Sequence, residues 1–214
     1  MNNRESYIAE LSQNLVPVKR MPNVNLLGVI WFTVSVIYVI AQIHFYDPIR
    51  PGAFSQTISS PRFLFESLLG IVAICWVGLQ TFRDAVPGLQ KHSFMIGGYL
   101  LIAIWLSQYV IGLISPALEP STLGKRDFCQ YETMIYSLPP ICLGWFLIRR
   151  FYPLEPVRTA ASISLASGMI PALYMQFACM YDPSHILMFH IAPGLLMVLV
   201  GVAITWYWQP DGSK

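Results

Sequence analysis

Two of the four cysteines stand at the borders of apolar segments, next to acidic residues and histidines. The residues of this set are Cys129, Cys179, Glu132, Asp182, His185 and His190. Glu132 follows Cys129 by three residues, a spacing that places both on one face of a helix. Thiols and imidazoles are the side chains that carry redox chemistry or bind soft metal ions. The set therefore predicts a signal-sensing site, provided that the fold brings both cysteines to one place.

The residues alone leave the chemistry of this site open. In an oxidising compartment Cys129 and Cys179 can form a disulfide, either structural or redox-sensitive. With His44 and His185 they can also supply ligands for zinc or copper, although no Cys-x-x-Cys or His-x-x-x-His spacing is present. Two unrelated cysteines at a membrane boundary are a further interpretation. Cys75 and Cys142 fall in the middle of apolar segments, where a thiol is typical of a small buried hydrophobic residue.

The elements that must position these residues are apolar helices. Of the 214 residues, 55% are hydrophobic and only 11% are charged, against about 25% charged in soluble domains. A membrane-spanning helix needs about 20 mostly apolar residues. Six stretches qualify, approximately 24–46, 61–83, 94–115, 131–148, 159–180 and 185–208. The sequence therefore predicts an all-α, polytopic membrane bundle of six transmembrane helices over residues 24–208.

The distribution of basic residues predicts the orientation of this bundle. Lysine and arginine are enriched in cytoplasmic loops. Nine of the 13 lie on the side of the N-terminus, namely Arg4, Lys19, Arg20, Arg83, Lys91, Arg149, Arg150, Arg158 and Lys214. Both termini, including the short tail 209–214, are therefore expected in the cytoplasm, and the loops near the two outer cysteines face the other side. The net charge of +2 indicates no direct binding of nucleic acid.

The fifth predicted helix carries a ridge of small residues. Ala160, Ser164, Gly168 and Ala172 are each four residues apart. Such a ridge lets a second membrane helix approach closely. We therefore expect the fifth helix to pack tightly inside the bundle.

Residues 1–23 are too polar to enter a bilayer but have one apolar face. Tyr7, Ile8, Leu11 and Leu15 form a stripe at helical spacing, Pro17 ends the helix, and Lys19 and Arg20 follow. The residues allow two interpretations. The helix can lie on the lipid surface, held there by the two basic residues, or it can place its stripe in the groove of a partner protein.

Three stretches of the sequence are similar to a known family. "YIAELSQNLVPVKRMP" resembles the opening of the NrsF-type membrane anti-sigma factors, "CQYETMIYSLPP" their outer cysteine before the fourth span, and "SGMIPALYMQFACMYDPSHILMFHIAP" their fifth span, second cysteine and later His-x-x-Pro. The resemblance covers essentially the whole chain. The sequence departs from the family pattern at Ala178, where a histidine is common, and at Phe189, where a tryptophan is common.

The resemblance implies a function and a set of partners. Proteins of this kind are not enzymes and need no cofactor; they hold an extracytoplasmic-function sigma factor at the bacterial inner membrane and release it under stress. By this resemblance the partner-binding residues are Tyr7, Ile8, Leu11, Leu15, Lys19 and Arg20, on the cytoplasmic side. The outer cysteine pair then changes its redox or metal state and shifts the bundle between two states.

Two other classes of function are compatible with six spans. A small membrane transporter would explain the prolines within the helices, but the inner half of the predicted bundle has no polar path. A quinone-linked thiol oxidoreductase would explain the outer cysteines, but its reactive Cys-x-x-Cys motif is missing. Uptake of substrate into vesicles would indicate the transporter, and reduction of quinone would indicate the oxidoreductase.

Overall fold

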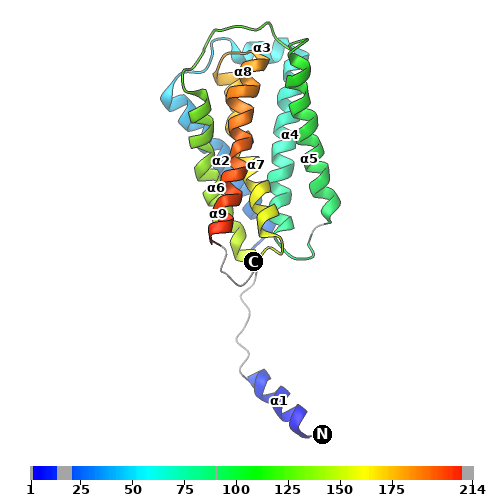
Figure 1. Cartoon of the computed structure of the whole chain (residues 1–214). Helices are drawn as coiled ribbons and strands as arrows, with labels where there is room; N and C mark the ends of the chain where they lie inside the picture. The colour runs from blue at the N-terminus through cyan, green and yellow to red at the C-terminus, as the bar shows by residue number, and fades with distance from the viewer. Residues whose placement is uncertain (1, 14–20, 90, 209–214) are drawn as a thin grey trace.

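The chain forms a bundle of long helices, seen in a computed structural model that describes residues 2–13, 21–89 and 91–208 (Figure 1). No strand occurs within these ranges. The helices are α1 (Asn2–Gln13), α2 (Val24–Tyr46), α3 (Ala53–Ser59), α4 (Pro61–Asp84), α5 (His92–Gly112), α6 (Cys129–Ile148), the 3-10 turn η1 (Arg149–Phe151), α7 (Pro156–Ala178), α8 (Pro183–His185), the π-helix η2 (Ile186–Ile191) and α9 (Ala192–Trp208).

A long helix occupies each of the six predicted stretches, so the all-helical class is confirmed. Within the described residues, four helices are long and apolar enough to cross a membrane: Val24–Tyr46, Pro61–Asp84, His92–Gly112 and Pro183–Tyr207. The other two, α6 and α7, bury several serine and threonine side chains. Buried polar residues in a membrane protein usually face the bundle interior, and α7 has the most buried residues of the helices described here.

Local sequence signals fix where several helices begin. The Asn23 side chain accepts hydrogen bonds from the backbone N–H groups of Asn25 and Leu26, and thereby caps α2. Ser60 caps α4 in the same way through Phe63 N–H, and Pro61 occupies the first turn, where its missing N–H costs nothing. Pro156 has the same place in α7.

The small-residue ridge of α7 packs as predicted. A Cβ atom at Gly168 would collide with the backbone of Gly194 in α9, and one at Gly201 would collide with the Ser164 hydroxyl. The backbones of α7 and α9 therefore touch, which larger side chains would prevent. Trp31 of α2 is fully buried and donates its indole N–H to the Pro140 carbonyl of α6. These contacts hold α2, α6, α7 and α9 as one core.

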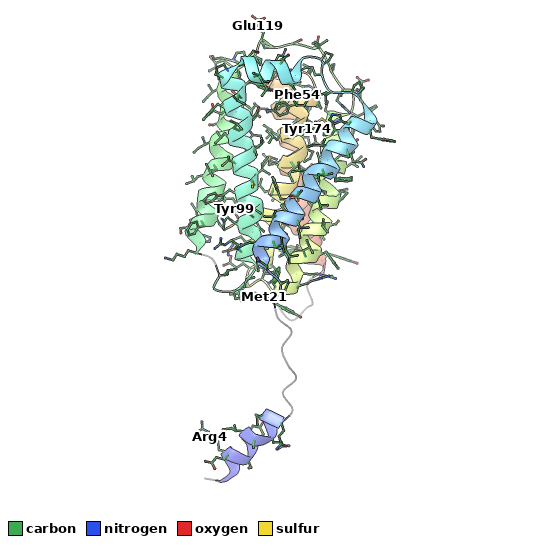
Figure 2. All side chains as sticks on the ribbon, turned by 180° about the vertical axis from the view of Figure 1, so that it is seen from behind. Arg4, Met21, Phe54, Tyr99, Glu119 and Tyr174 are labelled. Atoms are coloured by element: carbon green, nitrogen blue, oxygen red, sulfur yellow. The ribbon has the colours of Figure 1, made fainter. Side chains whose placement is uncertain are left out.

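The bundle has two distinct ends. We call the end that carries α3 and α8 the upper end, and the end where α2 begins and α9 finishes the lower end (Figure 1). Figure 2 places Glu119 at the upper end, Met21 at the lower end, and Arg4 on α1, which lies apart from the bundle beyond the lower end.

Candidate thiol and metal site

The two cysteines from separate helices meet at the upper end. Cys129 is the first residue of α6, and Cys179 follows the last residue of α7 directly. Their Sγ atoms are 2.9 Å apart, and both residues are buried and free of a disulfide. The Cys129 thiol also lies 3.0 Å from the Arg126 carbonyl oxygen, to which it can donate. The arrangement holds two thiols side by side, shielded from water.

Two histidines complete a cluster around these thiols. His185 Nε2 lies 3.4 Å from Cys179 Sγ, and the His185 and His190 rings are perpendicular, with centroids 5.1 Å apart. His190 is completely buried, and neither of its ring nitrogens makes a hydrogen bond of normal geometry to any described residue. The four ligand atoms of Cys129, Cys179, His185 and His190 all lie within 4.8 Å of one another.

This spacing is close to that of a tetrahedral metal site. Zinc holds sulfur at about 2.3 Å and nitrogen at about 2.0–2.1 Å, so its ligand atoms are separated by about 3.3–3.8 Å. The cluster needs only small side-chain rotations to reach that range. A buried imidazole without a hydrogen bond is also costly, and a bound ion would satisfy His190. The four residues therefore fit a soft cation such as Zn²⁺ or Cu⁺.

The π-helix η2 brings the two histidines to the same face. In an α-helix, residues five apart point about 140° away from each other, because each residue turns the helix by about 100°. A π-helix closes its hydrogen bonds from i to i+5, which moves such residues toward one face. η2 spans Ile186–Ile191, directly after His185 and through His190. The pairing of these histidines therefore depends on a local departure from α-helical geometry.

Asp182 and Glu132 support the cluster without belonging to it. Asp182 Oδ1 accepts the backbone N–H of His185 at 3.0 Å and caps α8. The hydrogen bonds from the Ser184 hydroxyl and the His185 backbone hold the pKa of Asp182 below its ordinary value. Glu132 forms an ion pair with Arg126 at 3.1 Å. Neither carboxylate is among the four clustered ligands.

Arg126 was not singled out by the sequence, yet it joins three parts of the upper end. Its guanidinium donates to the carbonyl oxygens of Ile43 and Asp47, at the end of α2, and pairs with Glu132 of α6. Its own carbonyl receives the Cys129 thiol. Arg126 is only 4% exposed, so this buried hub fixes the first turn of α6 relative to α2.

Arg50 is a second buried arginine near the site. Its backbone N–H donates to the Ala178 carbonyl, and its guanidinium lies 6.0 Å from the centre of the Tyr181 ring. Burial lowers the pKa of Arg50, and the nearby Cys179 and Tyr181 oppose this effect. Gly124 has a φ of 76°, which residues with a side chain rarely adopt, and a Cβ there would clash with the Arg50 side chain at 2.9 Å.

The loop before α6 is tied to the segment after Cys179. Tyr181 accepts the backbone N–H of Ala117 through its hydroxyl, and its carbonyl accepts the backbone N–H of Ser121. Burial raises the pKa of Tyr181 to about 12, so the hydroxyl stays neutral. These bonds hold the loop before α6 against the segment that follows Cys179.

The remaining predicted residues lie elsewhere. His44, considered from the sequence as a metal ligand, is outside the cluster: its Nδ1 lies 3.0 Å from the Ile40 carbonyl oxygen, and its ring packs near Tyr174. In α1 the predicted partner-binding residues Tyr7, Ile8 and Leu11 are all exposed. Leu15, Lys19 and Arg20, like the tail 209–214, lie outside the described residues.

Comparison with known proteins gives one match. The family model described as NrsF, negative regulator of sigma F, matches residues 11–208, which include the end of α1 and the whole bundle. No curated protein and no solved structure matches the chain. Because the matched region covers nearly the full length, the chain belongs to the NrsF family of negative regulators of sigma F.

Proposed function

We propose that this negative regulator is a six-span anti-sigma factor of the bacterial inner membrane, with both termini in the cytoplasm. It sequesters an extracytoplasmic-function sigma factor and has no enzymatic activity of its own. Six long helices in one bundle, four of them apolar enough to span a membrane, support this topology. A reporter that is active only in the periplasm should be silent after Lys214 and active near Ser121. The reverse result would contradict the orientation.

The sigma factor binds the N-terminal helix α1. Its apolar residues Tyr7, Ile8 and Leu11 are more than half exposed, at 62%, 56% and 54%, and α1 lies apart from the bundle (Figure 2). An amphipathic helix of this kind commonly fits into an apolar groove of a partner. In this proposal the bundle anchors α1 at the membrane, and the sigma factor covers its apolar stripe.

The cysteine–histidine cluster receives the signal, and its geometry is the observation that carries this part of the proposal. Four soft ligand atoms lie within 4.8 Å, and one of them belongs to a buried, unbonded imidazole. The signal is a soft metal ion that displaces the thiol protons on binding. The two thiols would also suit an oxidant that forms a disulfide, with His185 favouring the thiolate of Cys179, and the metal is proposed because all four ligand atoms converge.

Metal binding is coupled to the lower end through η2 and α9. An ion held by Cys129, Cys179, His185 and His190 would fix both imidazoles against the thiols and would thereby act on the π-helical turn between them. α9 continues directly from η2 and runs to the lower end, with Gly194 against Gly168 of α7. A shift from 1:99 to 99:1 between two states needs about 5.5 kcal/mol. Zinc binding to Cys and His ligands is worth about 10–16 kcal/mol in zinc-finger peptides at pH 7, so the switch requires that about 5.5 kcal/mol of the binding free energy differ between the two states.

A metal titration of the purified complex tests this function. The full chain is co-purified with its sigma factor in detergent, and Zn²⁺ or Cu⁺ is added to one equivalent. We expect one bound ion and release of the sigma factor. The His190→Ala variant should bind the ion more weakly and retain the sigma factor, whereas the His44→Ala control should behave as the parent. Release by metal in a Cys129→Ser, Cys179→Ser variant would contradict the proposed site.

A further inference from the structure

A cavity of about 340 Å³ lies between α6, α7 and α9, away from the cysteine–histidine cluster. Its walls are mostly apolar, with Trp145 and Phe146 from α6, Ile163 from α7 and Ile204 from α9. Arg149, directly after α6, also lines it. The volume falls within the range of about 300–1,000 Å³ that is typical of small-molecule sites.

Small residues at the contact between α7 and α9 leave the space for this cavity. Ala160, Ser164 and Gly201 line it, and the helices approach so closely there that a Cβ at Gly201 would meet the Ser164 hydroxyl. The larger side chains of α6 stand on the other side. The cavity is therefore built into the packing of three helices.

Arg149 makes the lower border of this cavity positively charged, and Arg150 follows it directly in the chain. The guanidinium groups of Arg149 and Arg150 lie 4.9 and 4.6 Å from the centre of the Phe146 ring. Both residues are exposed, and neither forms an ion pair with a carboxylate in the described part of the chain. An apolar cavity with exposed cations at its lower border is complementary to a ligand with an apolar tail and an anionic head.

We propose that this cavity binds one anionic phospholipid of the inner leaflet. One acyl chain occupies the space between α6, α7 and α9, and the headgroup phosphate contacts Arg149 and Arg150. Guanidinium groups bind phosphate through paired hydrogen bonds, and the cytoplasmic leaflet is rich in anionic lipids. The inference rests on the proposed membrane orientation, which places these arginines at the inner surface, but not on sigma-factor binding.

Lipid competition measured by native mass spectrometry tests the site. The full chain in detergent is given equal amounts of phosphatidylglycerol and phosphatidylcholine. We expect one retained lipid with a preference for phosphatidylglycerol. The Arg149→Gln variant should lose about fivefold of this preference, which corresponds to about 1 kcal/mol for one basic contact. Cys142→Phe, which adds bulk at an exposed position of the cavity wall, should reduce retention of both lipids.

Two control variants separate this site from general surface effects. Lys91→Gln removes a positive charge before α5, outside the cavity lining, and Ile104→Phe adds bulk to an exposed face of α5. Both should retain lipid as the parent does. An unchanged preference in Arg149→Gln, or an equal loss in Lys91→Gln, would overturn the site, whatever either variant does to capture of the sigma factor.

Discussion

The two ends of the bundle treat their charged residues in opposite ways. At the upper end Arg126 and Arg50 are only 4% and 3% exposed, and the ion pair of Arg126 with Glu132 is buried. At the lower end the side chain of Arg158 is 28% exposed where it pairs with Asp84 and Glu155, and Arg149 and Arg150 are exposed. At the upper end, buried arginines thus hold the helices around the thiols in place, whereas at the lower end the arginine side chains are accessible at the surface.

This difference matches the two tasks proposed for this regulator. A site that receives a metal ion has to hold its ligands in place before the ion arrives, because ordering them costs binding free energy. A surface that captures a protein or a lipid has to leave its contact groups accessible. The buried hub of Arg126 and the exposed stripe of α1 are the two extremes of this contrast.

The largest effect is expected when the thiols are removed. Replacing Cys129 and Cys179 with serine takes away two of the four clustered ligands, so the affinity for Zn²⁺ or Cu⁺ should fall at least about a thousandfold, or about 4 kcal/mol. Calorimetric titration of the purified chain measures this. The Cys75→Ser, Cys142→Ser variant is the matched control and should bind metal normally. Equal affinity in both double variants would show that the cluster is not the site.

Loss of the Arg126 hub should be the next largest effect. Arg126→Met leaves the buried Glu132 carboxylate without its ion-pair partner, which should cost about 3–5 kcal/mol of stability. Arg158→Met at the lower end breaks a pair in which Asp84 is only 7% exposed but the Arg158 side chain is 28% exposed, so the loss of stability should be smaller than that of Arg126→Met. Thermal unfolding in detergent compares the two. Similar losses of stability in the two variants would show that the ends do not differ. Partial recovery of stability in the double variant Arg126→Met, Glu132→Gln would show that the unpaired Glu132 carboxylate causes the loss.

A charge on the stripe of α1 should affect only the lower end. Leu11→Asp places a carboxylate where the sigma factor is proposed to bind, so capture should weaken by about 2 kcal/mol, or roughly thirtyfold. Because Leu11 is exposed on a helix apart from the bundle, thermal unfolding and metal binding should not change. Co-purification measures capture, with Gln13→Asp, on the opposite face of the same helix, as the control. Undiminished capture would exclude α1 as the contact.

The sequence predicted the helices better than it predicted the site. Apolar stretches identified the six long helices, and the small-residue ridge predicted a close helix contact along α7 but not its partner Gly194, because both features are periodic local patterns. The order of the helices also placed Cys129 and Cys179 at the same end. The membrane crossings of α6 and α7 and the cytoplasmic side of the termini remain predictions.

The rest depends on geometry that no local pattern records. His190 joins His185 only because η2 is a π-helix, and nothing in Ile186–Ile191 distinguishes it from the α-helix that follows. Arg126 resembles any loop arginine in the sequence, yet its partners Ile43 and Asp47 lie some eighty positions earlier in the chain. The sequence likewise gives the depth of His44 in the bundle but not the direction of its ring. His44 was therefore a candidate ligand, whereas in the structure its ring turns toward Tyr174.

The smallest effect is expected at Asp182, where capping and ligand orientation can be separated. Asp182→Ala removes the oxygen that accepts His185 N–H, so the first turn of α8 should lose about 1 kcal/mol. Because α8 carries His185, metal affinity should fall about tenfold, as is common when a residue that orients a ligand is lost. Asp182→Asn keeps an accepting oxygen, so this variant should retain most of the stability of α8 and most of the metal affinity.

The pH dependence of this cap gives a further check. The folded pKa of Asp182 lies below its ordinary value, so the charged cap stabilises the fold fully above the unfolded pKa of about 3.9. This stabilisation is lost as the pH falls through the lower, folded value. Thermal unfolding of the parent and of Asp182→Asn should therefore differ at neutral pH and converge in strong acid. If the two proteins instead differ in thermal stability by the same amount at every pH, Asp182 acts through packing and not through its charge. The position of His185 would then be set by η2 alone.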